Sequence, residues 1–420
     1  MKIPVLGKAR YKSPVAFRVN DQARIPEHIV RGPGVGRLEG MLFEVAGPRA
    51  RIFFDSGQTR AGIVTCGGLC PGLNNVIRSV YLELYHHYGV KDVLGFRYGY
   101  QGLDPALGRE PIALTPDFVE DIHQEGGTVL GTSRGPVDAG RAVDNLIRLK
   151  VNILFAVGGD GTQRGALCLF LEAQRRGHAL AVVGIPKTVD NDVPFVSQTF
   201  GYLTAVEEAA HMLRCAHTEA HSVPNGISLV KIMGRNSGFV TAGATVASQE
   251  VNFCLIPEVP FALGGTQGFM AMLKKRVSNR AHALIAVAEG AGQELLGKGA
   301  ESRDASGNVR LMNIGVFLRS QIAAYFKAEK IPVVLRYMDP GYAIRSVPAN
   351  AEDAIMCDLY ARHAVHAAMA GKTGMVIGYL HDRFIHVPIE LLATRVKRID
   401  PNAPGWNAVL ASTGQPARFE

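Results

Sequence analysis

The chain has 420 residues, of which 47% are hydrophobic and 20% are charged, and this composition excludes a disordered or fibrous protein. At this length we expect two domains rather than one. The net charge of +8 comes without a basic run or a basic–aromatic interleave, so we expect no nucleic-acid partner and a small acidic substrate such as a phosphate.

Cysteine content and apolar runs bear on where the protein works. Six cysteines in 420 residues are too few for a disulfide framework and indicate a reducing compartment. The first residues lack the apolar segment of a signal peptide, and no apolar stretch reaches the ~18 residues of a membrane span. We therefore expect a cytoplasmic protein with no membrane partner.

Periodicity divides the chain into an irregular start and an alternating remainder. Residues 1–60 predict an extension with short strands at Met41–Val45 and Ala50–Phe54. From residue 61 apolar runs alternate with amphipathic stretches, which indicates a parallel α/β architecture. The predicted strands are Ala61–Thr65, Val93–Phe96, Ile153–Val157, Ala181–Ile185, Ile227–Met233, Asn252–Ile256 and His282–Ala288. The predicted helices include Leu73–His87, Gly165–Arg176, Thr199–Thr218 and Ala349–Ala370.

A first glycine-rich loop, Cys66-Gly67-Gly68-Leu69-Cys70-Pro71-Gly72, follows the first strand of the alternating region and leads into a helix. Free N–H groups and the helix dipole predict an anion site there. The loop matches neither the dinucleotide fingerprint nor the P-loop, so a purely structural turn stays open.

A second glycine loop, Gly158-Gly159-Asp160-Gly161-Thr162, follows the strand predicted at Ile153–Val157. We expect a helix to begin near Gln163. Ligands of open α/β sheets bind at the carboxyl ends of strands. Asp160 suits a Mg²⁺ ion that bridges donor phosphates, because Mg²⁺ prefers one or two carboxylates plus phosphate oxygens. The alternative is that Asp160 only caps the following helix.

A third segment, Pro186-Lys187-Thr188-Val189-Asp190-Asn191-Asp192, places two acids, a hydroxyl and a lysine after an apolar strand. Neighbouring acids at such a place predict a general base, and a solvated turn is the alternative. Two arginines, Arg134 after a glycine loop and Arg235 after a strand, suit bidentate phosphate contacts, although either alone could form a surface ion pair. Together these groups indicate phosphoryl transfer.

In this order, the motifs CGGLCPGLNNVIR, GGTVLGTSRG, GGDGT, PKTVDND, IMGR, IPEV and DPGYAIR resemble those of the phosphofructokinase family over residues 61–385. The plant- and protist-type ATP-dependent branch shares PKTVDND-like and YxxR-like motifs and an N-terminal extension. The resemblance implies two Rossmann-like parallel-sheet domains. Residues 61–201 plus 338–385 would bind ATP and Mg²⁺, and residues 202–337 plus 386–420 would bind the sugar phosphate and include a C-terminal tail.

The resemblance implies that ATP phosphorylates fructose 6-phosphate at the 1-hydroxyl, a step of glycolysis. It assigns the donor to Gly67, Arg134, Gly135, Gly159, Asp160, Gly161, Thr162 and Lys187, with Asp160 holding Mg²⁺. It assigns catalysis to Asp190 as the base, with Thr188 and Arg235. It assigns the sugar phosphate to Thr188, Val189, Asp190, Met233, Gly234, Arg235, Glu258, Tyr342 and Arg345.

Three positions depart from the short bacterial form of the family. Two arginines that reach the 6-phosphate from a neighbouring subunit correspond to Gly226 and Ile331, and a histidine corresponds to Tyr337. We therefore expect Tyr342 and Arg345 to hold the 6-phosphate, and the allostery tied to that subunit contact is not implied. The family suggests a homotetramer or a homodimer.

Other functions and another donor stay open. Kinases of the NAD-kinase or lipid-kinase type share a GGDGT loop but do not need PKTVDND, and a non-catalytic sensor could dispense with Asp160 and Asp190. Diphosphate is the alternative donor, since diphosphate-dependent relatives use a lysine where Lys187 stands. Gly161 leaves room for a nucleotide, whereas those relatives have an aspartate there. The argument from Gly161 is the stronger one, because a side chain there would exclude a nucleotide, whereas Lys187 only permits diphosphate. We therefore predict ATP as the donor.

Overall fold

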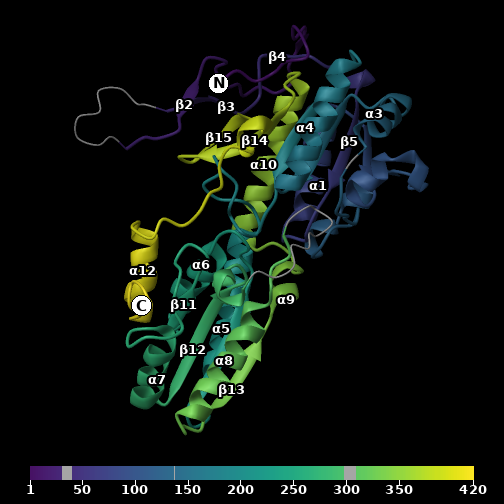
Figure 1. Cartoon of the computed structure of the whole chain (residues 1–420). Coiled ribbons are helices and arrows are strands. Elements are labelled where there is room, and N and C mark those ends of the chain that lie inside the picture. Colours follow the sequence, from purple (N-terminus) through teal and green to yellow (C-terminus); the bar gives the residue numbers. More distant parts are fainter. Residues whose placement is uncertain (31–39, 137, 298–308) are drawn as a thin grey trace. The chain divides into compact units, whose positions relative to one another are not determined.

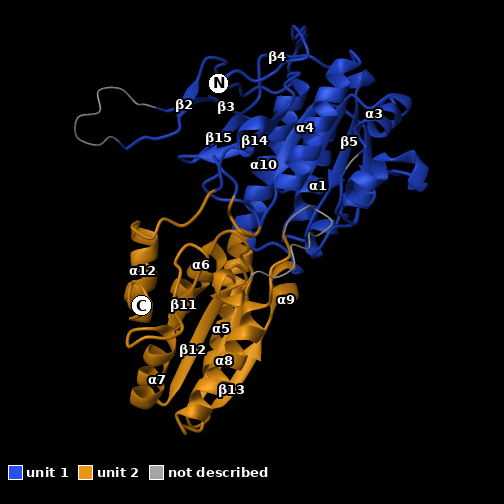
Figure 2. Cartoon of the chain, in the orientation of Figure 1, with its two compact units in different colours: residues 1–188, 193–201, 346–396 blue, residues 189–192, 202–345, 397–420 orange. Residues whose placement is uncertain are grey.

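The computed structural model describes residues 1–30, 40–136, 138–297 and 309–420. The chain divides into two compact units, which Figure 2 colours blue and orange. Unit 1 comprises residues 1–188, 193–201 and 346–396, and unit 2 comprises residues 189–192, 202–345 and 397–420. Each unit is an α/β structure around a sheet of its own (Figure 1), which confirms the predicted fold class.

Unit 1 contains a nine-stranded sheet in the order β2-β3-β15-β14-β9-β8-β5-β6-β7. The five strands from β14 to β6 are parallel, and the strands at both edges are antiparallel. The strands are β2 (Arg24–Pro26), β3 (Leu42–Val45), β5 (Arg60–Thr65), β6 (Asp92–Phe96), β7 (Ile112–Ala113), β8 (Ile153–Gly158), β9 (Ala181–Pro186), β14 (Met375–Leu380) and β15 (Arg383–Pro388). A separate ribbon pairs β1 (Tyr11–Lys12) with β4 (Arg51–Ile52).

The two middle strands of the unit 1 sheet, β8 and β9, are apolar throughout, as expected for a parallel sheet that helices cover on both faces. Every residue of β8 and β9 is buried. The helices are α1 (Leu73–Leu82), α2 (Pro116–Val119), α3 (Ala139–Arg148), α4 (Asp160–Arg175), α10 (Ala351–Met369) and α11 (Ile389–Leu392), with a π-helical turn η2 (Glu83–His87) after α1. The 3₁₀ turns are η1 (Ser56–Gln58), η3 (Gly99–Leu103), η4 (Pro105–Leu107) and η5 (Ile122–Gln124).

Unit 2 contains a four-stranded, fully parallel sheet in the order β11-β12-β10-β13. Its strands are β10 (Gly226–Ile232), β11 (Phe253–Leu255), β12 (His282–Ala288) and β13 (Val334–Met338). Its helices are α5 (Tyr202–His221), α6 (Phe239–Ser248), α7 (Phe269–Arg280), α8 (Ile314–Ala328), α9 (Gly341–Arg345) and α12 (Pro404–Thr413), with a 3₁₀ turn η6 (Gln293–Leu296). The core includes Phe253, Phe269 and Phe419, whose ring centres lie 5.5–6.0 Å apart.

Three helices begin elsewhere than the sequence predicts, of which α10 is displaced least, beginning at Ala351 rather than Ala349. Helix α4 begins at Asp160 rather than near Gln163, so the second glycine loop is its first turn. Helix α5 begins at Tyr202 rather than Thr199, because Gly201 has a φ of +81° that a helix does not allow. The strand expected at Ala50–Phe54 is reduced to the two residues of β4.

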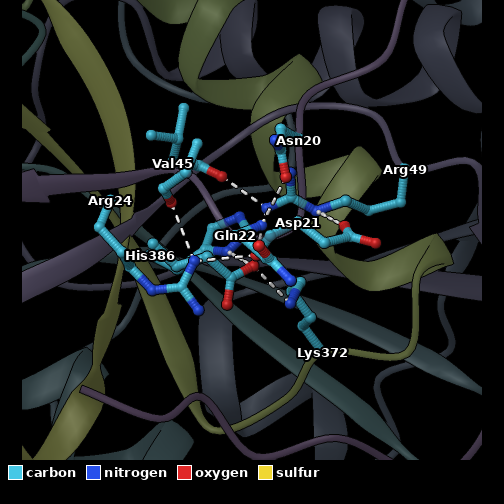
Figure 3. Close-up of polar contacts among 10 residues, drawn as sticks. Asn20, Asp21, Gln22, Arg24, Val45, Arg49, Lys372 and His386 are labelled. Carbon is cyan, nitrogen blue, oxygen red and sulfur yellow. Dashed lines mark hydrogen bonds and ion pairs between the residues drawn. The ribbon is translucent and has the colours of Figure 1, made fainter.

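Residues 1–60, expected as an extension, belong to unit 1, and an ionic cluster joins them to later parts of that unit (Figure 3). Glu44 on β3 contacts Arg49 at 2.7 Å, Lys372 at 2.6 Å and His386 of β15 at 3.2 Å. Burial raises the pKa of Glu44, but the hydrogen bond to His386 and the nearby cations hold it well below its ordinary value. Burial lowers the pKa of His386 to about 4.

The units also differ from the expected domains near residues 338–396. Residues 338–345 belong to unit 2, since α9 follows β13, and residues 386–396 belong to unit 1, since β15 pairs with β14. Among the helices in the described ranges, none combines the length and hydrophobicity that a membrane crossing needs.

Candidate functional site

Three neighbouring parallel strands of unit 1 end at the same edge of the sheet. Thr65 of β5 lies opposite Val157 of β8, and Gly158 of β8 lies opposite Pro186 of β9. The loops that follow these strands are therefore neighbours at the carboxyl edge, where α/β sheets bind ligands. The predicted residues of this edge, which we call the unit 1 site, are Gly67, Arg134, Gly135, Gly159, Asp160, Gly161, Thr162, Lys187 and Thr188.

The loop that carries Arg134 and Gly135 is fastened to the first glycine loop. The Gly67 N–H donates to the Ser133 carbonyl oxygen at 3.0 Å, and the Thr132 hydroxyl donates to the Gly67 carbonyl oxygen at 2.7 Å. Gly67 and Gly135 have φ angles of +87° and +128°, which favour glycine. The structure thus brings together two predicted loops that lie more than sixty residues apart in sequence.

Asn74, which the sequence reasoning did not single out, makes a second connection between these loops. Its side-chain oxygen accepts the Val129 N–H at 2.9 Å, and its amide donates to the Glu125 carbonyl oxygen at 3.1 Å. Asn74 is 1% exposed. The sequence signal that could have identified it is an asparagine at the start of a helix that directly follows a glycine loop.

Lys187 joins the first and second glycine loops. Its Nζ donates to the Gly68 carbonyl oxygen at 2.6 Å, and its backbone N–H donates to the Gly158 carbonyl oxygen at 3.2 Å. The side chain is only 6% exposed. A Cβ atom on Gly67 would stand 3.4 Å from Nζ, so the ammonium lies directly against this glycine.

The amino end of α4 is the open part of the unit 1 site. Gly159 precedes the helix, and Asp160 and Gly161 are its first two residues, both exposed. Asp160 is thus inside the helix and does not occupy the capping position. Thr162 is buried, and its carbonyl oxygen accepts the Tyr100 hydroxyl at 2.5 Å.

The carboxyl of Asp160 has a modified affinity for protons. Loss of hydration raises its pKa above the ordinary value, and the Arg164 guanidinium acts in the opposite direction. The side chain nevertheless reaches solvent. A cation bound at this carboxylate would offset its negative charge and would favour its ionised form.

The amino end of α1 differs from the anion site predicted there. Pro71, Gly72 and Leu73 are buried, and a Cβ atom on Gly72 would stand 2.4 Å from the Cys357 sulfur of α10. The amino end of α1 is therefore covered by protein. The accessible part of this loop is Gly67–Leu69, which is partly exposed.

The parallel strands of unit 2 also gather predicted residues at their carboxyl edge. Met233, Gly234 and Arg235 follow β10, Glu258 follows β11, and α9 follows β13. Val189 and Asp190 belong to the short segment 189–192 of the same unit. The unit 2 site, as we call it, comprises Val189, Asp190, Met233, Gly234, Arg235, Glu258, Tyr342 and Arg345.

Ser237 and Gly238, which the sequence reasoning missed, connect Asp190 to Glu258. The buried Ser237 hydroxyl donates to the Asp190 carbonyl oxygen at 3.0 Å. The Gly238 N–H lies 3.1 and 3.0 Å from the two carboxylate oxygens of Glu258. Both residues closely follow the predicted Arg235, and a Ser-Gly pair between a strand and a helix is the signal that was available.

The loop after β10 turns sharply at Gly234. Its φ is +125°, and a Cβ atom there would stand 2.4 Å from the Ser237 carbonyl oxygen, so only glycine fits. Arg235 donates from Nη2 to the Val309 carbonyl oxygen. Met233 lies near α9, because a Cβ atom on Gly341 would be 3.9 Å from the Met233 Cγ.

Tyr342 and Arg345 form an accessible pair on α9. The Arg345 guanidinium carbon lies 5.1 Å from the centre of the Tyr342 ring, within cation–π distance. Tyr342 is 78% exposed. In the part of the chain that the structure describes, the buried Nε of Arg345 has no hydrogen-bond partner. A guanidinium with an unused donor suits an anionic ligand.

The residues at the three positions that depart from the short bacterial form all pack within unit 2. A Cβ atom on Gly226, the first residue of β10, would stand 2.0 Å from the Ala220 carbonyl oxygen, so an arginine does not fit there. Tyr337 packs on Gly315, and its hydroxyl donates to the Asn313 side chain at 3.3 Å. Ile331 packs against the core of the unit.

Comparisons with known proteins agree with these observations. The family model described as Phosphofructokinase matches residues 60–368. An ATP-dependent 6-phosphofructokinase of Borreliella burgdorferi is 44% identical over 431 aligned residues, covering 99% of this chain and 96% of the relative. One from Trypanosoma brucei brucei is 49% identical over 373 residues, covering 88% and 76%.

A solved structure extends the comparison to the fold. A pyrophosphate-dependent phosphofructokinase from Marinobacter aquaeolei superposes with a TM-score of 0.70, covering 84% of this chain and 91% of that one. The sequence identity is 19%, so this likeness shows the fold alone.

Proposed function

The chain belongs to the phosphofructokinase family, and we propose that it transfers the γ-phosphoryl group of ATP to the 1-hydroxyl of fructose 6-phosphate. The two relatives described above are named ATP-dependent 6-phosphofructokinase, which supports this proposal. The structural observation that carries the proposal is the open amino end of α4, where the exposed Asp160 and Gly161 stand in a glycine loop beside the loop of Gly67.

The unit 1 site would hold the phosphoryl donor. Backbone N–H groups of the glycine loops and the amino end of α4 favour phosphate oxygens. Arg134 would contact the phosphates from the loop fastened at Gly67, and the buried ammonium of Lys187 would offset their charge. Thr162 supports the first turn of α4 from inside the unit.

Asp160 fits a Mg²⁺ ion that arrives with the nucleotide. Among the described residues, no group of three or more His, Cys, Asp or Glu side chains is arranged to hold a metal. A single exposed carboxylate suits Mg²⁺, which takes most of its remaining ligands from phosphate and water. When bound, the ion would neutralise charge on the donor phosphates.

The unit 2 site would hold the sugar phosphate and provide the base. Asp190 would take the proton of the 1-hydroxyl while the hydroxyl oxygen bonds to the γ-phosphorus of ATP. The bond between the γ-phosphorus and the oxygen that leaves with ADP breaks in the same step. Arg235 would offset developing negative charge, and Thr188 would contact the acceptor. Arg345 and Tyr342 would bind the 6-phosphate, which the unused Nε of Arg345 supports.

Four further residues complete the proposed sugar site. Val189, Met233 and Gly234 would line the acceptor at the ends of their segments. Glu258 would accept sugar hydroxyls in addition to the backbone N–H groups that it already binds. A carboxylate has about four acceptor positions, so both roles are compatible.

Diphosphate is the second candidate donor, and Lys187 is the residue that favours it. Its ammonium would neutralise a diphosphate as readily as a nucleotide. Gly161 weighs against diphosphate because its position has room for a side chain yet carries none. A Cβ atom there would meet nothing nearer than Arg164 Nη2, at 3.8 Å. The space is therefore left for the rest of a nucleotide.

We also propose a cytoplasmic location and a homotetramer or homodimer. All six cysteines are free thiols, which supports a reducing compartment. The oligomeric state rests on the family resemblance, and sedimentation of the purified chain measures it. The activity itself is tested by release of ADP when fructose 6-phosphate is added to protein, ATP and Mg²⁺. No release above a control without the sugar would refute it.

A further inference from the structure

The C-terminal segment Lys397–Ile399 returns to the unit 2 site. The Lys397 N–H donates to the Asp192 carbonyl oxygen at 3.3 Å. The Ile399 N–H donates to a carboxylate oxygen of Glu258 at 3.0 Å, a contact between residues 141 positions apart. The segment therefore holds both the loop that carries Asp190 and the acid that follows β11.

The side chain of Lys397 is placed unusually for a lysine. Its Nζ lies 5.0 Å from the ring centre of Phe239, the first residue of α6, and it interacts with the Asp192 carboxylate. Burial lowers the pKa of Lys397 to about 8, and Asp192 acts against this change. Lysine side chains usually extend their ammonium into water, so this position needs a reason.

We propose that Lys397 is a positioning residue of the unit 2 site, and that its ammonium holds Asp192 and offsets its charge beside the base Asp190. The inference rests on the proposed function. Two uncompensated carboxylates in one short loop would repel a sugar phosphate, whereas an Asp192 whose charge is offset by the lysine leaves only the charge that the reaction uses. The hydrogen bond from the Lys397 N–H to the Asp192 carbonyl oxygen keeps the same loop in place.

Among the described residues, the carboxylate of Asp192 acts on this ammonium. Asp190 lies in the same loop, and Glu258 accepts the N–H of Ile399. Helix α6 contributes no charged residue, since its sequence is FVTAGATVAS. The next residue, Arg398, is exposed and serves as a matched control. The attraction to Asp192 is lost as the pH rises through about 8, when the lysine becomes neutral.

The test compares Lys397→Met, Lys397→Arg and Arg398→Met with the parent. We expect Lys397→Met to raise the half-saturating fructose 6-phosphate concentration at least tenfold, because the charge of Asp192 is then no longer offset, and that of ATP less than twofold. Lys397→Arg should restore the parent value within about threefold and should remove the decline in sugar-phosphate affinity above pH 8, since arginine keeps its charge.

A double-mutant cycle with Asp192→Asn shows whether the lysine acts through Asp192. We expect the half-saturating fructose 6-phosphate concentration of the double variant to be no higher than that of Lys397→Met alone. Kd values for fructose 6-phosphate measured by calorimetry should rank the variants in the same order. A sugar-phosphate dependence of Lys397→Met equal to that of Arg398→Met, or strictly additive effects, would overturn the inference. A parent protein that neither binds nor phosphorylates fructose 6-phosphate would instead refute the proposed function.

Discussion

The Nζ of Lys187 lies 2.6 Å from the carbonyl oxygen of Gly68, so the one positive charge of the PKTVDND segment lies against the first glycine loop. The same residue is bonded through its backbone to Gly158 of the second loop. One buried cation thus links both loops of the unit 1 site. In the proposed function this cation would neutralise any phosphate donor, so we expect the open position at Gly161 to decide which donor is used.

Gly161→Asp should abolish use of ATP without unfolding the protein. An aspartate side chain would occupy the space left for the nucleotide and repel its α-phosphate. The fold should tolerate it, because a Cβ atom at this position would stand 3.8 Å from Arg164 Nη2 and an acid in the first turn of a helix is favourable by about 0.3–1 kcal/mol. Steady-state rates with ATP and a melting curve measure both effects.

Gly161→Asn is the matched control for that experiment. It has nearly the same size as aspartate but no charge, so a smaller loss of ATP activity would assign part of the effect to repulsion. Full ATP activity in Gly161→Asp would contradict the role given to this glycine. The variant need not gain activity with diphosphate.

Asp190→Asn should lower kcat by roughly 10²–10⁴-fold, the usual contribution of a general base. The amide has the same shape, and the bond from Ser237 is to the Asp190 backbone, so folding should be preserved. Turnover within a few-fold of the parent, with an unchanged melting temperature, would show that another group takes the proton.

Arg345→Ala should weaken fructose 6-phosphate binding about 10- to 150-fold and leave ATP nearly unaffected, because charged hydrogen bonds contribute about 1.5–3 kcal/mol each. Half-saturating concentrations of both substrates are the measurement. Arg336→Ala is the control, since that arginine pairs with Glu219 at the exposed surface of β13. Equal effects of the two variants on the sugar phosphate would exclude Arg345 from the 6-phosphate site.

The buried His386 makes stability depend on pH. Its pKa is lowered to about 4, so between the ordinary value of 6.5 and 4 the unfolded chain binds a proton there that the folded chain does not. Stability therefore falls as the pH falls. We expect His386→Asn, which keeps a donor for Glu44, to reduce the loss between pH 6.5 and 5 by about 2 kcal/mol. Urea unfolding at both pH values measures it, and an unchanged loss would contradict a neutral buried histidine.

The parallel core was predictable from sequence because its strands are continuous apolar runs. The start of α4 was not, since the glycines around Asp160 give no capping signal and resemble a loop. The hairpin of β14 and β15 was missed for a similar reason. It turns at His381 and Asp382, with φ angles of +50° and +57°, where a sequence normally shows Asn-Gly.

The sequence indicated the candidate site residues of each motif, but not which motifs lie next to one another. Strand order decides which motifs become neighbours, and the adjacency of β5, β8 and β9 cannot be derived from their spacing. The contact of Ile399 with Glu258 was still less accessible. It spans 141 positions and uses a backbone N–H, which every residue except proline possesses.

The most direct test of the central claim is a phosphorus NMR measurement on the purified protein. Fructose 6-phosphate and Mg²⁺ are supplied with equal concentrations of ATP and diphosphate in one tube. We expect the ATP resonances to give way to ADP, a new phosphate ester to appear at C1 of the sugar, and the diphosphate resonance to stay constant. Consumption of diphosphate with ATP untouched, or ATP loss without fructose 1,6-bisphosphate, would contradict the account.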